Sequence, residues 1–255
     1  MTTPAVMKRT TVSTFRRSSS DRVPNALTYK NPHNGVNVVV SRRHDGDMHP
    51  GHVPSSVLER RRQAVLAGRW TQLAQCHSAD VVEVNTPGEH DGSSGDVAAT
   101  AAPSAVLGIW TGDCAPIVLA TADGSRLVAA HAGWRGLVRG VLREAVRALG
   151  DTRDATVVFG PMIGACCYEF NVDERDVVAD ALGVSTATIS GFTTWGTPAL
   201  DMDAAVRAGL AACGVNTDAA ISLGGCTGCC PELFSHRVRR DPERFVTAAV
   251  LERAA

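Results

Sequence analysis

The chain has 255 residues, of which 44% are hydrophobic and 20% are charged, and its formal net charge is −1. These values are typical of a globular protein, and the near-neutral charge gives no electrostatic reason to bind nucleic acid or a membrane surface. The sequence has no apolar run long enough for a membrane span, and its first thirty residues lack the apolar core of a secretory signal. We therefore expect a cytoplasmic protein with small-molecule partners.

The N-terminal segment differs in composition from the rest of the chain. Residues 1–33 begin with many Ser, Thr and Arg residues and contain no acidic residue before Asp21, which predicts a partly disordered tail. Residues 34–255 contain neither an internal repeat nor a linker, which predicts a single domain. In a reducing cytosol, the eight cysteines are not expected to form a disulfide framework.

Apolar patterning predicts alternating helices and strands. A helix is expected between residues 53 and 70, and a Gly- and Ser-rich loop at 88–95. The expected elements that follow are buried strands at 105–110, 116–120 and 126–130, an amphipathic helix over 134–149, a strand at 155–159, a helix capped by Asn171 and closed by Gly183, a helix at 202–213, a strand at 219–223, and a strand or short helix at 245–251. This order predicts one mixed α/β unit.

Three loops place reactive side chains near the ends of expected strands, where functional sites are common. They are Gln75-Cys76-His77, TGDCAP at 111–116 and HAGWRG at 131–136. Together, His77, Cys114 and His131 would supply two imidazoles and one thiolate, a set that suits Zn²⁺ with a fourth position open. The alternative for each residue is structural: a surface histidine, a small core cysteine and a helix-capping histidine.

The third loop also has the features of an anion site. Glycines flank Trp134-Arg135 at the start of the expected long helix. Backbone N–H groups at a helix start and a guanidinium both favour a negative ligand. Phosphate or a carboxylate is therefore the expected ligand of this loop.

The same motifs resemble those of the YfiH-like, or laccase-domain, family. HAGWRG, preceded by T-x-D-C-x-P and by Q-x-H, occurs in the family's order. Later landmarks follow: GPMIGACCYEF at 160–170, LDM at 200–202, and CT followed by LFSHRVRRD up to residue 241. The resemblance covers roughly residue 35 to the end. The chain departs from the family pattern at Gly112, where alanine is usual, and after Phe234, and these changes put the substrate preference in doubt.

The resemblance implies an α/β (α+β) fold with mixed β-sheet layers flanked by helices. It also implies a metal held by His77, Cys114 and His131, with zinc favoured and copper possible. Members are described as purine nucleoside phosphorylases acting on adenosine, inosine and S-methyl-5'-thioadenosine, with adenosine deaminase activity. The implied partners are purine nucleosides and phosphate, and we expect a monomer or a weak homodimer.

Catalytic roles follow from this reading as hypotheses, with Cys114 and His131 expected in catalysis as well as at the metal. In phosphorolysis, Arg135, with Arg237, would hold the phosphate that attacks the ribose C1′. In deamination, water activated by the metal would attack C6 of adenine, and Asp113 or Asp96 would move the proton.

Two other enzyme classes remain open. Cys114 could be a nucleophile activated by His131 or His77, giving an amide hydrolase of the kind linked to editing of peptidoglycan precursors. A copper polyphenol oxidase is the third reading, but a multicopper electron path needs more histidines than the sequence can group.

The remaining cysteines suggest a non-enzymatic alternative. Cys226, Cys229 and Cys230, with Cys166 or Cys167, could form a structural zinc knot, since Cys226 and Cys229 have C-x-x-C spacing. Cys166 and Cys167 are adjacent and do not make a second spaced pair. Buried or incidental thiols are therefore the favoured interpretation.

Overall fold

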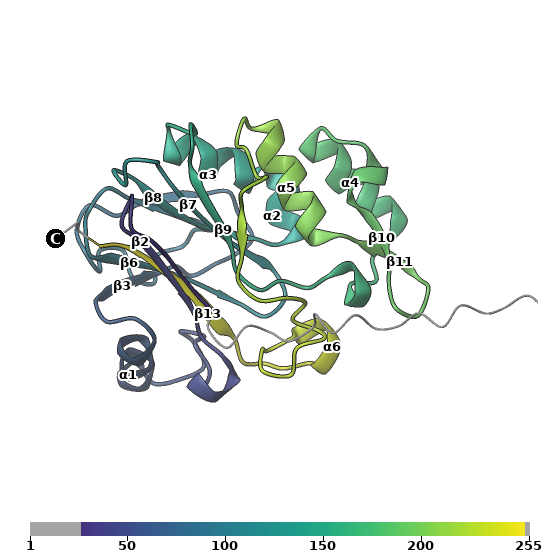
Figure 1. The fold of residues 1–255 in the computed structure, drawn as a ribbon. Coiled ribbons are helices and arrows are strands. Elements are labelled where there is room, and N and C mark those ends of the chain that lie inside the picture. The colour runs from purple at the N-terminus through teal and green to yellow at the C-terminus, as the bar shows by residue number, and fades with distance from the viewer. Residues whose placement is uncertain (1–26, 253–255) are drawn as a thin grey trace, which may run out of the picture.

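The fold consists of two large β-sheets packed face to face, with helices on their outer faces (Figure 1). This computed structural model describes residues 27–252. The first sheet contains β1 (Thr28–Asn31), β2 (Val36–Val40), β3 (Arg69–Gln72), β6 (Ala105–Thr111) and β13 (Phe245–Leu251). The second contains β4 (Val81–Glu83), β5 (Val97–Thr100), β7 (Ala115–Ala120), β8 (Leu127–Ala132), β9 (Thr156–Phe159) and β12 (Ile221–Ser222).

The helices and a small hairpin complete the described chain. The helices are α1 (Ser55–Val65), α2 (Trp134–Arg139), α3 (Val141–Leu149), α4 (Val172–Leu182), α5 (Met202–Ala212) and α6 (His236–Arg239), with 3-10 helices η1 (Arg43–Asp45), η2 (Ala165–Cys167) and η3 (Thr186–Ile189). The hairpin pairs β10 (Ser190–Phe192) with β11 (Pro198–Leu200). None of the helices in the described part of the chain is both long and apolar enough to span a lipid bilayer.

Both large sheets contain parallel and antiparallel strand pairs. The first sheet runs β1-β2-β13-β6-β3 and the second β12-β9-β7-β8-β5-β4. β3 is parallel to β6, and β4 to β5, while β7 is antiparallel to both β8 and β9. The predicted α/β fold with mixed sheet layers flanked by helices is confirmed.

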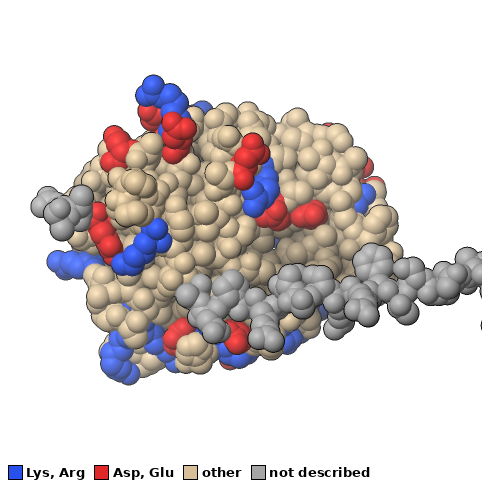
Figure 2. Space-filling model, viewed as in Figure 1, with Lys and Arg blue, Asp and Glu red and all other residues tan. Residues whose placement is uncertain are grey.

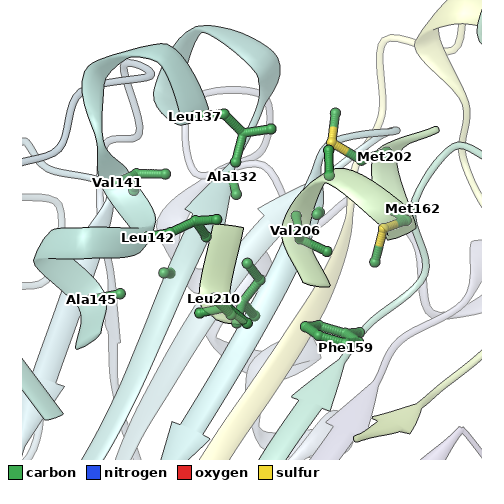
Figure 3. Close-up of a cluster of buried hydrophobic side chains, with 14 of the residues drawn as sticks. Ala132, Leu137, Val141, Leu142, Ala145, Phe159, Met162, Met202, Val206 and Leu210 are labelled. Carbon is green, nitrogen blue, oxygen red and sulfur yellow. The ribbon is translucent and has the colours of Figure 1, made fainter. Parts of the chain in front are cut away.

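The alternation of side chains along the central strands creates the layers. In β7, Val118 and Ala120 pack between the two sheets, while Ile117 and Leu119 pack against the helices on the other face. Figure 3 shows this helix layer, with Leu142 of α3 and Leu210 of α5 above the strands. Each fully buried large apolar side chain contributes about 1.5–3 kcal/mol relative to exposure. The continuous apolar runs in the sequence therefore reflect strands that are buried on both faces.

The structure differs from several sequence expectations. The helix expected up to residue 70 ends at Val65, and Trp70 instead lies in β3. The long helix expected over 134–149 is divided at Gly140, whose φ of +86° ends α2 before α3 begins. Such a backbone conformation is easy for glycine and interrupts helical hydrogen bonding. The last segment is a strand, not a helix.

The expected N-terminal tail lies mostly outside the described residues. Its last part, however, is not a tail, because Thr28–Asn31 forms β1, an edge strand paired antiparallel with β2. Backbone pairing with β2 satisfies the polar groups on one side of this segment, although its sequence has little apolar character. On the face shown in Figure 2, acidic and basic side chains lie near one another, in keeping with the near-neutral net charge.

Candidate metal centre

The structure brings His77, Cys114 and His131 together. Their potential ligand atoms all lie within 4.8 Å of one another. Cys114 Sγ is 3.7 Å from His77 Nε2, and the rings of His77 and His131 have centroids 4.9 Å apart. Their convergence is therefore a property of the fold and not only of the motifs.

Strand pairing explains how two of these residues meet. Cys114 immediately precedes β7 and His131 is the penultimate residue of β8, and these antiparallel neighbours pair Ala115 with Ala132. His77 comes from the loop after β3, so the first sheet supplies the third side chain. The site thus lies where the two sheets meet at one end.

Asp96 positions His131 and the loop that carries His77. Its carboxylate is 2.8 Å from His131 Nδ1 and accepts the backbone N–H groups of Cys76, His77 and Ser78. Since Nδ1 faces Asp96, Nε2 is the ring nitrogen of His131 left for a metal. Burial alone would raise the pKa of Asp96, but these hydrogen bonds outweigh it and hold the pKa well below its usual range. Asp96 is therefore a buried anion.

Charge coupling within the cluster favours a thiolate. Burial opposes ionisation of Cys114, but the charges of and hydrogen bonds with His131 and His77 lower the pKa of Cys114 to about 6. Burial would likewise lower the pKa of His131, but Cys114 and Asp96 raise it to about 9. Without a metal, Cys114 is therefore a thiolate beside the imidazolium of His131, and the thiolate is the form that binds metals.

The close approach of the candidate ligands requires a glycine. A Cβ atom on Gly133 would lie 2.5 Å from His77 Cδ2 and 2.9 Å from Cys114 Sγ. The φ of Gly133 is −83°, which any residue can adopt, so the requirement here is space. The glycine in HAGWRG therefore makes room for two of the ligand side chains.

Gln75 connects the histidine loop to the first sheet. Its side-chain amide donates to the carbonyl of Trp110 at 2.8 Å and accepts from the N–H of Trp110 at 3.1 Å. The Trp110 ring is nearly parallel to the His131 ring, with centroids 6.4 Å apart, and the His49 ring centroid is 4.3 Å from that of Trp110. The Q-x-H motif thus combines one candidate ligand with the residue that positions its loop. No role for Trp110 or His49 was predicted from the sequence.

Asp113 occupies a strained backbone position beside Cys114. Its φ is +132°, a region that non-glycine residues avoid and that is common at functional sites. Its buried carboxylate accepts hydrogen bonds from Thr227 Oγ1 at 2.5 Å, Ser235 Oγ at 2.7 Å and the Arg237 N–H at 2.6 Å. These bonds suit a residue that positions the loop more than one that exchanges protons.

The two candidate phosphate-binding arginines both influence the ionisation of Tyr168. Arg237 is 4.6 Å above the Tyr168 ring and donates to the Glu169 carbonyl, while Arg135 is exposed and stacks on Trp134 at 4.3 Å. Burial and the Cys114 charge raise the pKa of Tyr168, and the positive charges of Arg237 and Arg135 oppose that rise. The ionisation of Tyr168 therefore responds both to Cys114 of the candidate metal centre and to the two arginines.

Sequence reasoning overlooked Tyr168. It also considered Asp96 only as a proton carrier. Asp96 is 35 residues before His131, and only the pairing of β5 with β8 brings them together. An acid directly before a short apolar strand is the only local signal for Asp96, and it is a weak one.

Comparisons with known proteins identify the family of the chain. The family model for multi-copper polyphenol oxidoreductase laccases matches residues 30–252. A purine nucleoside phosphorylase of Streptomyces coelicolor is 36% identical over 182 residues, covering 69% of this chain and 73% of the relative. A purine nucleoside phosphorylase of Xylella fastidiosa is 35% identical over 189 residues, covering 69% and 70%.

Solved structures share the fold. A Neisseria meningitidis protein of the DUF152 family matches with a TM-score of 0.77 at 23% identity, covering 90% of this chain and 100% of that one. YfiH of Bacillus licheniformis matches with a TM-score of 0.72 at 22% identity, covering 86% and 94%. The recognised resemblance to the YfiH-like family is therefore confirmed.

Proposed function

Because the chain belongs to the family of multi-copper polyphenol oxidoreductase laccases, we propose that it is a zinc-dependent purine nucleoside phosphorylase. Its relatives in Streptomyces and Xylella are named purine nucleoside phosphorylases. The observation that carries the proposal is the convergence of His77, Cys114 and His131 within 4.8 Å. Adenosine, inosine and S-methyl-5'-thioadenosine are the proposed substrates, with phosphate as the second.

The residues present fit a catalytic zinc ion. Two imidazoles and a thiolate form a three-ligand set with a fourth position free for substrate or water. Asp96 fixes the His131 ring, which is the usual arrangement behind a metal-binding histidine. When bound, zinc would act as a Lewis acid on the nucleoside. Within residues 27–252 the other metal-binding cluster contains four cysteines and no histidine, so zinc is favoured over a multicopper centre.

Two arginines and a tyrosine are the proposed phosphate-binding residues. Arg135 and Arg237 hold the phosphate dianion, and stacking of Arg135 on Trp134 limits its freedom before binding. A phosphate oxygen then attacks the ribose C1′ as the bond from C1′ to the purine nitrogen breaks. The departing purine takes up the proton that the phosphate loses. The products are the free base and the sugar 1-phosphate, which is ribose 1-phosphate from adenosine or inosine and its 5-methylthio analogue from S-methyl-5'-thioadenosine. Tyr168 stays neutral because its pKa is raised, so its hydroxyl can donate a hydrogen bond to the phosphate.

Adenosine deamination is the second proposed activity of the same pocket. In this reaction, water and not phosphate is the second substrate. Water would add at C6 of adenine, and ammonia would leave to give inosine. Both carboxylates considered for proton transfer already accept at least three hydrogen bonds. Asp96 and Asp113 are therefore proposed as positioning residues for both reactions.

Product analysis tests the proposal. Metal-analysed protein is incubated with each of the three nucleosides, with and without phosphate, and the products are identified by mass spectrometry. Phosphate-dependent release of base and ribose 1-phosphate is expected, with inosine from adenosine as the deaminase product. His131→Ala should abolish both, while His44→Ala, at an exposed site, should not. Absence of base release from zinc-loaded protein would refute the phosphorylase assignment.

A thiol hydrolase is the second candidate function. The lowered pKa of Cys114 and its 3.7 Å contact with His77 also suit a cysteine nucleophile. Such an enzyme would cleave amides, including those of cytoplasmic peptidoglycan precursors. Chelation separates the candidates, because it abolishes a zinc phosphorylase and leaves a thiol hydrolase active.

The cellular setting is also proposed. The eight cysteines are free thiols, which suits the reducing cytoplasm. We expect a monomer or a weak homodimer, and sedimentation velocity at several protein concentrations measures this state.

A further inference from the structure

A second group of metal-binding side chains is formed by Cys166, Cys167, Cys226 and Cys229. Their sulfur atoms all lie within 4.8 Å of one another. Cys166 and Cys167 end η2, and the other two lie in the loop between β12 and α6. None of the four belongs to the candidate metal centre at His77. This four-cysteine cluster joins two segments that are about sixty residues apart in the sequence.

The spacing of the sulfur atoms matches a tetrahedral ion. Zinc binds thiolates at about 2.3 Å, which places the corners of a regular tetrahedron about 3.8 Å apart. Cys229 Sγ lies 3.5 Å from Cys166 Sγ and 3.4 Å from Cys167 Sγ. A disulfide would join only two sulfurs, and the two cysteines of η2 are almost equally near Cys229. The arrangement thus favours a shared ion over one particular pair.

The backbone around the cluster is arranged for sulfur ligands. The Gly164 N–H donates to Cys226 Sγ at 3.2 Å. The N–H groups of Cys229 and Cys230 both donate hydrogen bonds to the Cys226 carbonyl, which closes the C-x-x-C loop. A Cβ on Gly228 would lie 2.8 Å from Cys167 Cβ, so glycine at this position allows the two segments to approach closely.

We propose that Cys166, Cys167, Cys226 and Cys229 bind a structural zinc ion, separate from the candidate catalytic ion. The ion replaces the thiol protons, which pass to solvent. Four thiolates leave no open position, so the site is closed and structural. Cys230, which the sequence placed in such a knot, is not a ligand. Its side chain is 6% exposed and packs in the core between the two sheets.

The position of the cluster gives the ion a role. Tyr168 directly follows Cys167 in the chain, and Thr227, between the other two ligands, donates to Asp113 beside Cys114. A zinc ion here would therefore brace two segments that border the candidate active site. This role does not depend on which reaction the active site performs.

Metal counting on the full chain tests the proposal. Protein purified under reducing conditions is analysed by inductively coupled plasma mass spectrometry, and two zinc ions per chain are expected. The double variants His77→Ala/His131→Ala and Cys166→Ser/Cys229→Ser should each lose one ion, from different sites. Cys230→Ala and Cys213→Ser are matched cysteine controls and should keep both.

A second measurement covers the case in which the cysteine variant does not fold. Cobalt substitution of His77→Ala/His131→Ala should give the intense thiolate-to-cobalt absorption of a four-sulfur site. One zinc in the wild type that is lost entirely from the histidine variant would overturn the proposal. So would absence of that absorption, or a native disulfide within the cluster found by peptide mapping without reductant.

Discussion

Asp96 lies 2.8 Å from His131 Nδ1, and the same carboxylate accepts the backbone N–H of His77. One buried acid therefore orients two of the three proposed ligands, His131 through its ring and His77 through its backbone. The carboxylate is shielded from water, since Asp96 is 2% exposed. Its charge raises the pKa of His131, and its hydrogen bonds fix the position of both histidines.

Replacing this acid should weaken metal binding without reshaping the pocket. Asp96→Asn keeps the side-chain size but turns one acceptor oxygen into an NH₂ group that cannot accept an N–H. We expect zinc affinity to fall roughly 10- to 100-fold, measured by competition with a chromophoric chelator. Asp151→Asn, which alters an exposed carboxylate paired with Arg153, is the control. An unchanged affinity would remove Asp96 from this role.

The space at Gly133 makes a second prediction. In Gly133→Ala the new methyl group would overlap the His77 ring and the Cys114 sulfur, so one ligand must move. We expect loss of the zinc ion from the candidate metal centre, with the fold retained because the φ of −83° suits alanine. Metal content and circular dichroism check the two parts. Gly225→Ala, where a Cβ would meet nothing within 4 Å, should retain its metal.

The elements that the sequence predicted are those with continuous apolar runs. Segments 105–110, 116–120 and 126–130 became β6, β7 and β8, because strands buried on both faces need apolar residues throughout. β3 and β4 escaped notice. Their sequences, RWTQ and VVE, are short and partly polar, and they are strands because β3 pairs with β6 and β4 pairs with β5. Local pattern cannot reveal such long-range pairing.

The convergence of the three candidate ligands could be predicted from the sequence, but the residues that position them could not. Motif resemblance selected His77, Cys114 and His131, and strand pairing then explains their convergence. The hydrogen bonds of Asp113 to residues more than 110 positions away have no local signal. For the second cluster, C-x-x-C spacing indicated Cys226 and Cys229, but the favoured view that these thiols are incidental overlooked the approach of η2.

The ionisation of Cys114 predicts an unusual pH profile. In metal-free protein, alkylation by iodoacetamide requires the thiolate, so its rate should fall as the pH drops through about 6 and level off above it. Cys213, whose pKa is raised by burial, should react only at alkaline pH and serves as the internal control. Peptide mass spectrometry separates the two sites. A Cys114 profile like that of an ordinary thiol would contradict the charge coupling, and bound zinc should block the reaction.

Asp113 should behave as a positioning residue. The Asp113 carboxylate accepts hydrogen bonds from Thr227, Ser235 and the backbone N–H of Arg237. Asp113→Asn replaces one of its two acceptor oxygens with an NH₂ group. We expect a lower melting temperature and a loss of about 1–3 kcal/mol in unfolding free energy, the usual effect of one buried polar group left unpaired. The pH dependence of kcat/KM should keep its shape. Loss of one limb of that profile would instead make Asp113 a proton carrier.

Phosphate recognition by Arg135 is the most direct test of the phosphorylase assignment. The exposed guanidinium stacks on Trp134, and its charge acts on Tyr168, whose pKa also responds to the charge of Cys114. A charge-assisted hydrogen bond contributes about 1.5–3 kcal/mol, so Arg135→Ala should raise the KM for phosphate roughly 10- to 100-fold. The KM for the nucleoside should change little. Arg147→Ala, on the exposed side of α3 and paired with Glu144, should leave both constants unchanged. If Arg135→Ala shows the wild-type phosphate dependence, another group binds the phosphate, and Arg237→Ala becomes the variant that locates it.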